Sequence, residues 1–221
     1  MMNRDLCLKY LETPQNDGEA DAPIVIFLHG RAANELDLFD LAPQITSKFR
    51  VLSPRAPIGM GNNCYGWFHT QYTCDGPVYD PQECESSRQL LIKFIEVVKC
   101  KYKVSSKNII LFGFSQGAIM SFGVALEKPT LVGGIACLSG RILSEHIPCN
   151  YSGSDFQGFP ILLSHGLSDE VLPIHYARAA KDILAQLPID LTYHEYPMGH
   201  DVTDINFSDV RKWLLARAVE Y

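Results

Sequence analysis

The 221-residue sequence has no apolar stretch of the roughly 20 residues needed to cross a bilayer. Its first ten residues carry charges where a secretory signal would need an unbroken apolar segment. It also has no basic run of the kind that binds nucleic acid, and its formal net charge is -6. These absences predict a cytoplasmic protein with no nucleic-acid partner and no stable membrane insertion. They favour small substrates that are neutral or cationic.

Disulfide and zinc patterns are missing as well. The seven cysteines are an odd number, which complete disulfide pairing cannot use, and no C-x-x-C is present. We therefore expect mostly reduced thiols, no metal and no cofactor. Cys64, Cys74 and Cys84 recur at even intervals in one loop-rich stretch, and a redox or metal role is the minor alternative, because the glycines and prolines between them give no ligand-like geometry.

The composition is that of an ordinary globular protein, with 47% hydrophobic and 20% charged residues. The length suits a single domain over residues 1–221. Apolar runs alternate with segments of helical period, which predicts an α/β fold with a mostly parallel central sheet and helices on both faces. The predicted strands are Leu6–Leu11, Ile24–Leu28, Arg50–Ser53, Ile109–Phe112, Gly133–Leu138, Ile161–His165 and Leu191–Tyr196.

Helical spacing of apolar residues appears in residues 85–101 and 173–187, the second with Pro173 in its first turn. A last helix is expected near the C-terminal end, with Ser208 as its N-cap. The apolar residues of 210–219 suit packing on the core or on a second copy of the chain, so a homodimer stays open.

Residues 54–81 form a stretch dominated by glycine, proline and aromatic residues. A loop this long in a compact domain is usually functional or disordered, and the aromatic content argues against disorder. Trp67 and Phe68 are candidate substrate-binding residues, as a wall or cover for an acyl group, because aromatic rings bury much apolar area. The alternative, given equal weight, is that they pack the loop onto the domain.

The strongest chemical motif is Gly113-Phe114-Ser115-Gln116-Gly117, a G-x-S-x-G between an apolar run at 108–112 and an apolar helical segment at 118–126. At a strand-turn-helix junction this pattern is typical of a nucleophile elbow, where glycines remove Cβ atoms that would clash and the serine hydroxyl is exposed at a helix N-terminus. Glycine-rich loops of this kind also occur in other α/β proteins. The decisive question is therefore whether an acid and a histidine follow.

An acid and a base do follow in that order. Asp169 comes just after the predicted strand at 161–165, at the edge where such enzymes gather their chemistry. Its alternative role is to cap the next helix, and Glu170 is a competing carboxylate. Among the later histidines His200 is the favoured general base, because it lies in a loop beyond a strand, whereas His175 and His194 lie within a helix and a strand.

An oxyanion hole needs backbone N–H donors beside the nucleophile. Gln116 supplies one, and Arg31 supplies a second from the loop after the strand at 24–28, where Gly30 permits a sharp turn. His29 is expected to order this loop by hydrogen bonding rather than to act as a base.

These pieces resemble the carboxylesterase, lysophospholipase and acyl-protein thioesterase family of α/β hydrolases. The matching segments spread over nearly the whole chain: Phe27-Leu-His-Gly30, Ser53-Pro-Arg-Ala-Pro57, Gly66-Trp-Phe68, Gly113-Phe-Ser-Gln-Gly-Ala118, His165-Gly-Leu-Ser-Asp169 and Gly199-His200. In the eukaryotic thioesterase branch leucine usually follows the His-Gly, whereas this chain has Arg31.

The resemblance implies a metal-free hydrolase with Ser115 as nucleophile, Asp169 as orienting acid and His200 as base. It implies a small-molecule acyl ester or thioester of short to medium chain length as substrate, cleaved through an acyl-enzyme, with acyl-protein thioesterase or lysophospholipase as the alternative. A second alternative is an inactive hydrolase fold that binds an acyl ligand. Dienelactone hydrolases share the expected fold but resemble this elbow with cysteine in place of Ser115.

Overall fold

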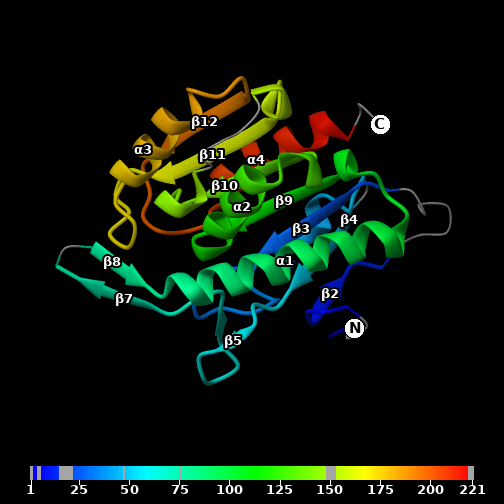
Figure 1. Ribbon diagram of the computed structural model, residues 1–221, viewed down its shortest axis with the longest axis horizontal. Helices are drawn as coiled ribbons and strands as arrows, with labels where there is room; N and C mark the ends of the chain where they lie inside the picture. Colours follow the sequence, from blue (N-terminus) through cyan, green and yellow to red (C-terminus); the bar gives the residue numbers. More distant parts are fainter. Residues whose placement is uncertain are drawn as a thin grey trace.

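The computed structural model describes residues 2–3, 6–14, 22–46, 48–74, 76–147 and 153–218. Its centre is an eight-stranded sheet in the order β1-β2-β4-β3-β9-β10-β11-β12 (Figure 1). The strands of this sheet are β1 Met2–Asn3, β2 Tyr10–Glu12, β3 Ile24–Leu28, β4 Arg50–Pro54, β9 Ile109–Phe114, β10 Gly134–Leu138, β11 Pro160–Gly166 and β12 Asp190–Tyr196. From β4 to β12 every neighbouring pair of strands is parallel. The β1–β2 and β2–β4 pairs are antiparallel. The predicted mostly parallel sheet is confirmed.

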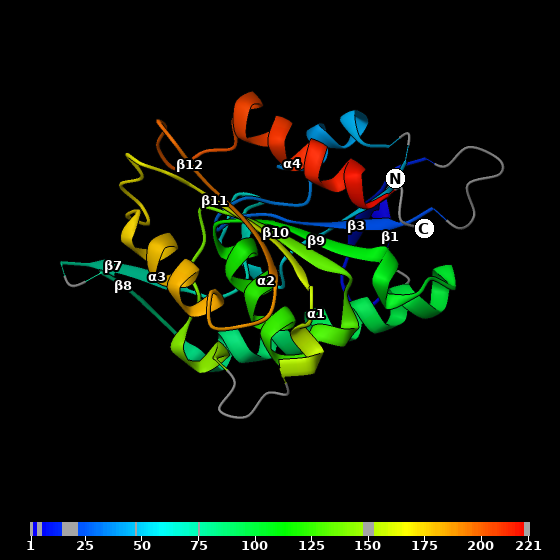
Figure 2. The same cartoon turned by 90° about the horizontal axis from the view of Figure 1, so that it is seen from above.

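Helices cover both faces of the sheet, as the alternating pattern predicts (Figure 2). The α-helices are α1 Pro81–Tyr102, α2 Gln116–Glu127, α3 His175–Leu184 and α4 Asp204–Arg217. Short 3-10 helices lie at Phe39–Gln44, Ser106–Asn108, Pro129–Leu131, Ser144–His146 and Gly153–Phe156. Among the described residues no helix is long and apolar enough to span a membrane.

The core consists of two apolar layers because successive side chains of a strand point to opposite faces. In β3, Ile24, Ile26 and Leu28 face the layer shared with α1, α2 and α3. Val25 and Phe27 face the other layer, which α4 closes. The central strands are therefore buried on both faces, as their continuous apolar runs indicate.

Three expected boundaries were wrong. The first strand is only Tyr10–Glu12 and not Leu6–Leu11, because pairing with β4 begins at Tyr10. The final helix begins at Asp204, where Thr203 and Asn206 form a reciprocal capping box, so Ser208 lies inside the helix. Helix α3 begins at His175, two residues after Pro173.

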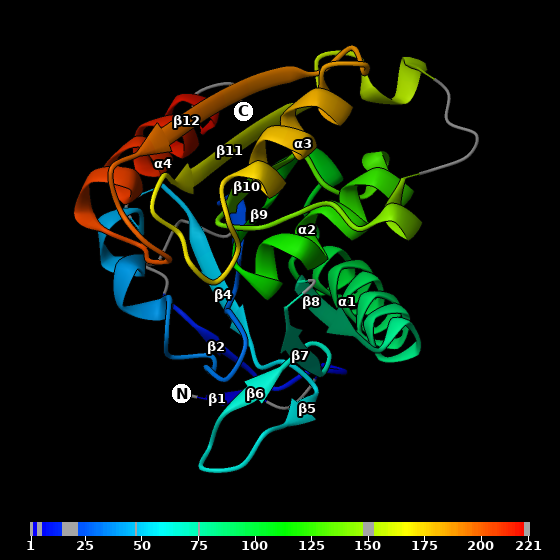
Figure 3. The same ribbon diagram turned by 90° about the vertical axis from the view of Figure 1, so that its left-hand side faces the viewer.

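The glycine- and proline-rich stretch at 54–81 is not a structureless loop. It contains two small antiparallel hairpins, β5 Ile58–Gly59 with β6 Tyr65–Gly66 and β7 Thr70–Thr73 with β8 Gly76–Tyr79. Helix α1 begins directly after it, capped by the Asp80 carboxylate, which accepts from the backbone N–H of Gln82 and Glu83. Both hairpins lie at the same end of the molecule (Figure 3), and β7–β8 projects beyond the helices (Figure 1).

Candidate active site

Ser115 stands at the junction of β9 and α2 in a backbone conformation that L-residues rarely adopt, with φ 54° and ψ -117°. Tight packing around the turn fixes this geometry. A Cβ on Gly113 would lie 2.4 Å from the backbone of Gly117. The two glycines of the pentapeptide are therefore needed for close approach, and the predicted strand-turn-helix context of Ser115 is confirmed.

Ser115, His200 and Asp169 form one hydrogen-bonded chain. His200 Nε2 lies 2.9 Å from Ser115 Oγ, and His200 Nδ1 lies 2.7 Å from Asp169 Oδ2. The three residues follow β9, β12 and β11, whose carboxyl ends meet at one edge of the sheet. Sequence positions 85 residues apart are thus brought within hydrogen-bond distance. His175 and His194 lie in α3 and β12, the ordinary structural places expected of them.

Asp169 is buried, and both of its carboxylate oxygens accept hydrogen bonds. Its Oδ1 accepts from the backbone N–H groups of Val171 and Leu172 at 2.9 and 2.8 Å. The carboxylate thus caps its own turn with one oxygen and faces His200 with the other, so the two roles considered for it coexist. Glu170 is exposed and makes no such contact among the described residues.

A second histidine donates to this carboxylate. The Nε2–H of His165, the residue that precedes Gly166 at the end of β11, points to Asp169 Oδ2 at 3.2 Å and to the Leu172 carbonyl at 2.6 Å. Burial raises the pKa of Asp169, but the hydrogen bonds from His165, His200 and the Leu172 N–H outweigh it and hold that pKa well below its usual range. Asp169 is therefore ionised at neutral pH. Sequence reasoning missed His165, although a histidine at a strand end four residues before the acid is a usable signal.

The loop after β3 is held against the elbow. A Cβ on Gly30 would lie 3.4 Å from the Ser115 Cβ, so the loop that carries the Arg31 N–H runs beside the nucleophile. Gln116 is the first residue of α2, where a backbone N–H has no intrahelical acceptor. The structure thus places the loop that carries Arg31 and the first residue of α2 beside Ser115.

His29 orders this loop, as expected. Its ring Nδ1 lies 2.8 Å from the Gly30 carbonyl, and its Nε2 accepts from the Ala56 N–H at 3.0 Å. The His29 carbonyl accepts from the Trp67 indole at 3.0 Å. Burial lowers the pKa of His29 to about 4, so the ring is neutral at pH 7 with its proton on Nδ1.

A buried ion pair supports the same loop. The Arg55 guanidinium binds both carboxylate oxygens of Glu35, at 2.6 and 2.5 Å, and donates to the Tyr65 hydroxyl at 2.9 Å. The Tyr65 N–H in turn donates to the Ala33 carbonyl at 2.7 Å. Arg55 belongs to the Ser53–Pro57 segment, and its part in fixing residues 33–35 was not foreseen.

Trp67 and Phe68 do not form an exposed acyl-binding wall. Their side chains are 0% and 1% exposed and lie in the core layer shared with α1 and α2, so the packing alternative describes this structure. The Gln116 side chain fastens their backbone: its Oε1 accepts from the Trp67 N–H at 3.0 Å and its Nε2 donates to the Phe68 carbonyl at 2.7 Å. The nucleophile elbow and the hairpin region are thereby joined.

The cysteine alternative finds no geometric support within the described chain. Cys64, Cys74 and Cys84 are free thiols, and Cys149 lies outside the described residues. No group of three or more His, Cys, Asp or Glu side chains in the described part of the chain is placed to hold a metal ion.

The parallel sheet, the strained serine at a strand-turn-helix junction and the acid and histidine on later loops define an α/β hydrolase. A model of the phospholipase/carboxylesterase family matches residues 12–217. The chain therefore belongs to this family and to the hydrolase class.

Relatives and solved structures agree with this assignment. Acyl-protein thioesterase 1 of Candida albicans is 27% identical over 92% of this chain and 95% of that protein. A probable SOBER1-like carboxylesterase of Arabidopsis thaliana is 30% identical over 52% of this chain, and the chain spans 44% of that protein's length. The carboxylesterase of Mesorhizobium loti, at 20% identity, superposes with a TM-score of 0.80 over 97% of this chain and 98% of that one. The carboxylesterase of Bacillus cereus, at 21% identity, gives 0.79 over 95% and 94%.

Proposed function

We propose that the protein is a serine hydrolase that cleaves carboxylic esters of short to medium acyl chains through an acyl-enzyme. The observation that carries this proposal is the position of His200, with one ring nitrogen 2.9 Å from Ser115 Oγ and the other 2.7 Å from Asp169 Oδ2. A serine hydroxyl needs a base to become nucleophilic, and the base needs a carboxylate to fix its tautomer.

In the first step Ser115 Oγ attacks the ester carbonyl while its proton moves to His200 Nε2. Asp169 accepts the Nδ1–H of His200 and stabilises the resulting imidazolium, because the carboxylate is ionised in its network of donors. The negative oxygen of the tetrahedral intermediate is bound by the backbone N–H groups of Gln116 and Arg31. Each such donor contributes roughly 3 kcal/mol to transition-state stabilisation.

His200 then donates its proton to the departing alcohol, which leaves the acyl group on Ser115. In the second step a water molecule gives one proton to His200 and attacks the acyl carbonyl. The C–O bond to Ser115 then breaks, His200 returns the proton to Ser115 Oγ, and the acid is released. The triad is used twice.

The same steps act on a thioester or on a lysophospholipid, since only the leaving group differs. Acyl-protein thioesterase or lysophospholipase activity is therefore the second candidate, and the full-length similarity to the Candida albicans acyl-protein thioesterase favours it. Parallel assays with p-nitrophenyl hexanoate, hexanoyl-coenzyme A and lysophosphatidylcholine separate these activities by their kcat/KM values.

The decisive experiment is hydrolysis of p-nitrophenyl esters from acetate to palmitate by wild type and Ser115→Ala. Loss of the nucleophile should lower kcat by at least about 10³-fold, while circular dichroism stays unchanged. Wild-type rates in the Ser115→Ala protein would rule out the proposed nucleophile. Labelling by a fluorophosphonate distinguishes an activated Ser115 from an inactive hydrolase fold that only binds an acyl ligand, which would remain unlabelled.

A further inference from the structure

Most arginines of this acidic protein are neutralised by a nearby carboxylate. Those with an Asp or Glu partner are Arg50, Arg55, Arg88, Arg178 and Arg217. Arg31 and Arg141 have no carboxylate partner among the residues that the structure describes, and both lie at the end of the molecule that carries the triad.

Arg31 is an exposed residue of the loop beside Ser115, and its own backbone N–H is the second oxyanion donor of the proposed function. Its guanidinium carbon lies 6.0 Å from the centre of the Tyr72 ring on strand β7. A cation over an exposed ring keeps its N–H donors available to a ligand. The Arg31 side chain is therefore free to bind a ligand, and it belongs to the same residue whose backbone N–H is the proposed oxyanion donor.

Arg141 also lies at the β7–β8 hairpin, but it comes from the loop after β10. It follows β10, whose Leu138 carbonyl accepts from the Ser115 N–H at 2.9 Å, and Gly140 packs on Ala118 in the first turn of α2. The guanidinium lies between the Tyr79 and Tyr176 rings, with centroids at 5.4 and 5.2 Å.

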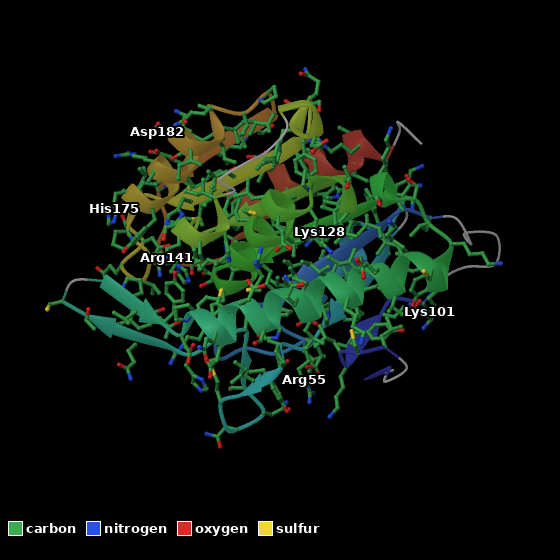
Figure 4. All side chains as sticks on the ribbon, in the orientation of Figure 1. Arg55, Lys101, Lys128, Arg141, His175 and Asp182 are labelled. Atoms are coloured by element: carbon green, nitrogen blue, oxygen red, sulfur yellow. The ribbon has the colours of Figure 1, made fainter. Side chains whose placement is uncertain are left out.

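One nitrogen of Arg141, Nη2, donates to the Pro77 carbonyl at 3.3 Å. Its Nε is buried and has no hydrogen-bond partner in the described structure. Figure 4 shows Arg141 on the side of the molecule where α3 and the hairpin β7–β8 lie.

Both cations contact one cross-strand pair of the hairpin. Tyr72 stands opposite Pro77 in the β7–β8 register, so Arg31 at the Tyr72 ring and Arg141 at the Pro77 carbonyl approach the same cross-strand pair of this hairpin. A cavity of about 190 Å³ beside the triad is lined by Asp37, Asp40 and Asp201, together with Phe114, and neither arginine lines it. Neither Arg31 nor Arg141 is in an ion pair with a described carboxylate, so two cations lie beside this hairpin although the net charge of -6 favours neutral or cationic substrates.

We propose that the natural substrate is an ester bearing an oxyanion, a carboxylate or phosphate, and that the side chains of Arg31 and Arg141 bind that group. The planar guanidinium fork matches both oxyanions. This inference rests on the proposed esterase function and adds a substrate class to it. It differs from the expectation of neutral or cationic substrates drawn from net charge alone.

Matched ester pairs test the proposal. The acyl-side pair is mono-p-nitrophenyl adipate against p-nitrophenyl hexanoate. On the alcohol side, 4-hexanoyloxybenzoate and 4-hexanoyloxyphenyl phosphate are each compared with methyl 4-hexanoyloxybenzoate. We expect wild type to prefer the anionic member of at least one pair by about tenfold in kcat/KM, and the pair that shows it identifies the side of the ester and the kind of oxyanion.

The variants Arg31→Gln and Arg141→Gln are each expected to lower the anionic-to-neutral ratio by about tenfold, and Arg31→Lys to keep most of it because the charge remains. Higher salt should reduce the ratio by screening. Arg211→Gln is the matched control, since Arg211 on α4 also has no described carboxylate partner and donates only to the Gln44 carbonyl. Thermal unfolding of each variant checks that it folds. If Arg141→Gln does not fold, the Arg31→Gln variant alone tests the proposal, because Arg31 is exposed.

A wild-type ratio near one in every pair, or a ratio unchanged in both glutamine variants, would overturn the inference while neutral esters are still cleaved by Ser115. Absence of all ester hydrolysis together with absence of fluorophosphonate labelling would instead overturn the proposed function, and the inference with it.

Discussion

The carbonyl oxygen of Leu28 lies 1.9 Å from the point where a Cβ atom on Gly117 would stand. The end of strand β3 and the first turn of α2 therefore touch at a place that admits only glycine. Because the loop with Gly30 and Arg31 continues directly from Leu28, this contact fixes the distance between the oxyanion loop and Ser115. The last glycine of the pentapeptide thus serves the site through packing between two elements.

We predict that Gly117→Ala lowers the free energy of unfolding by about 3 kcal/mol and also lowers kcat/KM, because β3 or α2 must move away. Urea unfolding and p-nitrophenyl ester hydrolysis measure the two effects. Gly59→Ala is the control, since no heavy atom lies within 4 Å of its added Cβ, and it should change stability by less than about 0.5 kcal/mol. Equal stability of the two variants would contradict the close contact.

Long apolar runs and the spacing of chemical motifs made much of this arrangement predictable. Five of the parallel strands, β3, β4, β9, β10 and β11, are mostly buried and carry apolar runs, so their positions followed from the hydrophobic pattern. The sixth parallel strand, β12, is only partly buried and mixes polar with apolar residues. Ser115, Asp169 and His200 each follow a parallel strand, and parallel strands bring their carboxyl ends to one edge. Their proximity was therefore predictable from topology alone.

What could not be predicted depends on side-chain contacts between distant segments. Glu35 and Arg55 lie 20 residues apart and meet only because their loops both leave the sheet at the same edge. The hairpins within 54–81 have strands of two to four residues, too short for alternation to be read. The burial of Trp67 is set by the indole bond to the His29 carbonyl, which no local pattern contains.

Replacing the acid tests the role of its network. Asp169→Asn puts an N–H group toward His200, whose Nδ1 must then accept instead of donate, so the ring presents the wrong tautomer to Ser115. We expect kcat to fall by roughly 10³- to 10⁴-fold. The free energy of unfolding should fall as well, because an amide nitrogen in place of Oδ2 cannot accept from His165. Glu170→Gln, on the adjacent exposed carboxylate, should retain the wild-type kcat. A large loss in the Glu170 variant with activity kept in the Asp169 variant would reverse the assignment.

The buried ion pair of the oxyanion loop gives a third prediction. The Glu35 and Arg55 side chains are 3% and 14% exposed, so Arg55→Met leaves a buried carboxylate without its partner. This should cost about 3–5 kcal/mol of unfolding free energy and reduce kcat more than it raises KM, because the Arg31 N–H loses its support.

The double variant Glu35→Gln with Arg55→Met should recover part of that stability, since no unpaired charge remains. Chemical denaturation of the two single variants and the double variant forms a thermodynamic cycle. Additive effects in that cycle would show that the pair does not couple.

Two buried histidines make stability depend on pH. Burial lowers the pKa of His146 to about 4, with a further lowering by the charge of Arg88, and burial lowers that of His29 to about 4. The ordinary value of 6.5 applies to the unfolded chain. Between these values the unfolded state binds more protons than the folded state, so the free energy of unfolding decreases as pH falls from about 6.5 toward 4.

We predict that His146→Gln removes one proton from this linkage. Between pH 6 and 5 the unfolding free energy of wild type should fall more steeply than that of the variant, by about 1 kcal/mol per pH unit. A pH-independent difference in stability between the two proteins does not affect this comparison of slopes. Above about pH 7.5 the histidine is neutral in both states, so the two curves should run parallel, which is the internal control. Urea unfolding across pH 5 to 8 measures both slopes, and identical slopes below pH 6 would show that His146 takes up a proton as readily in the folded protein as in the unfolded chain.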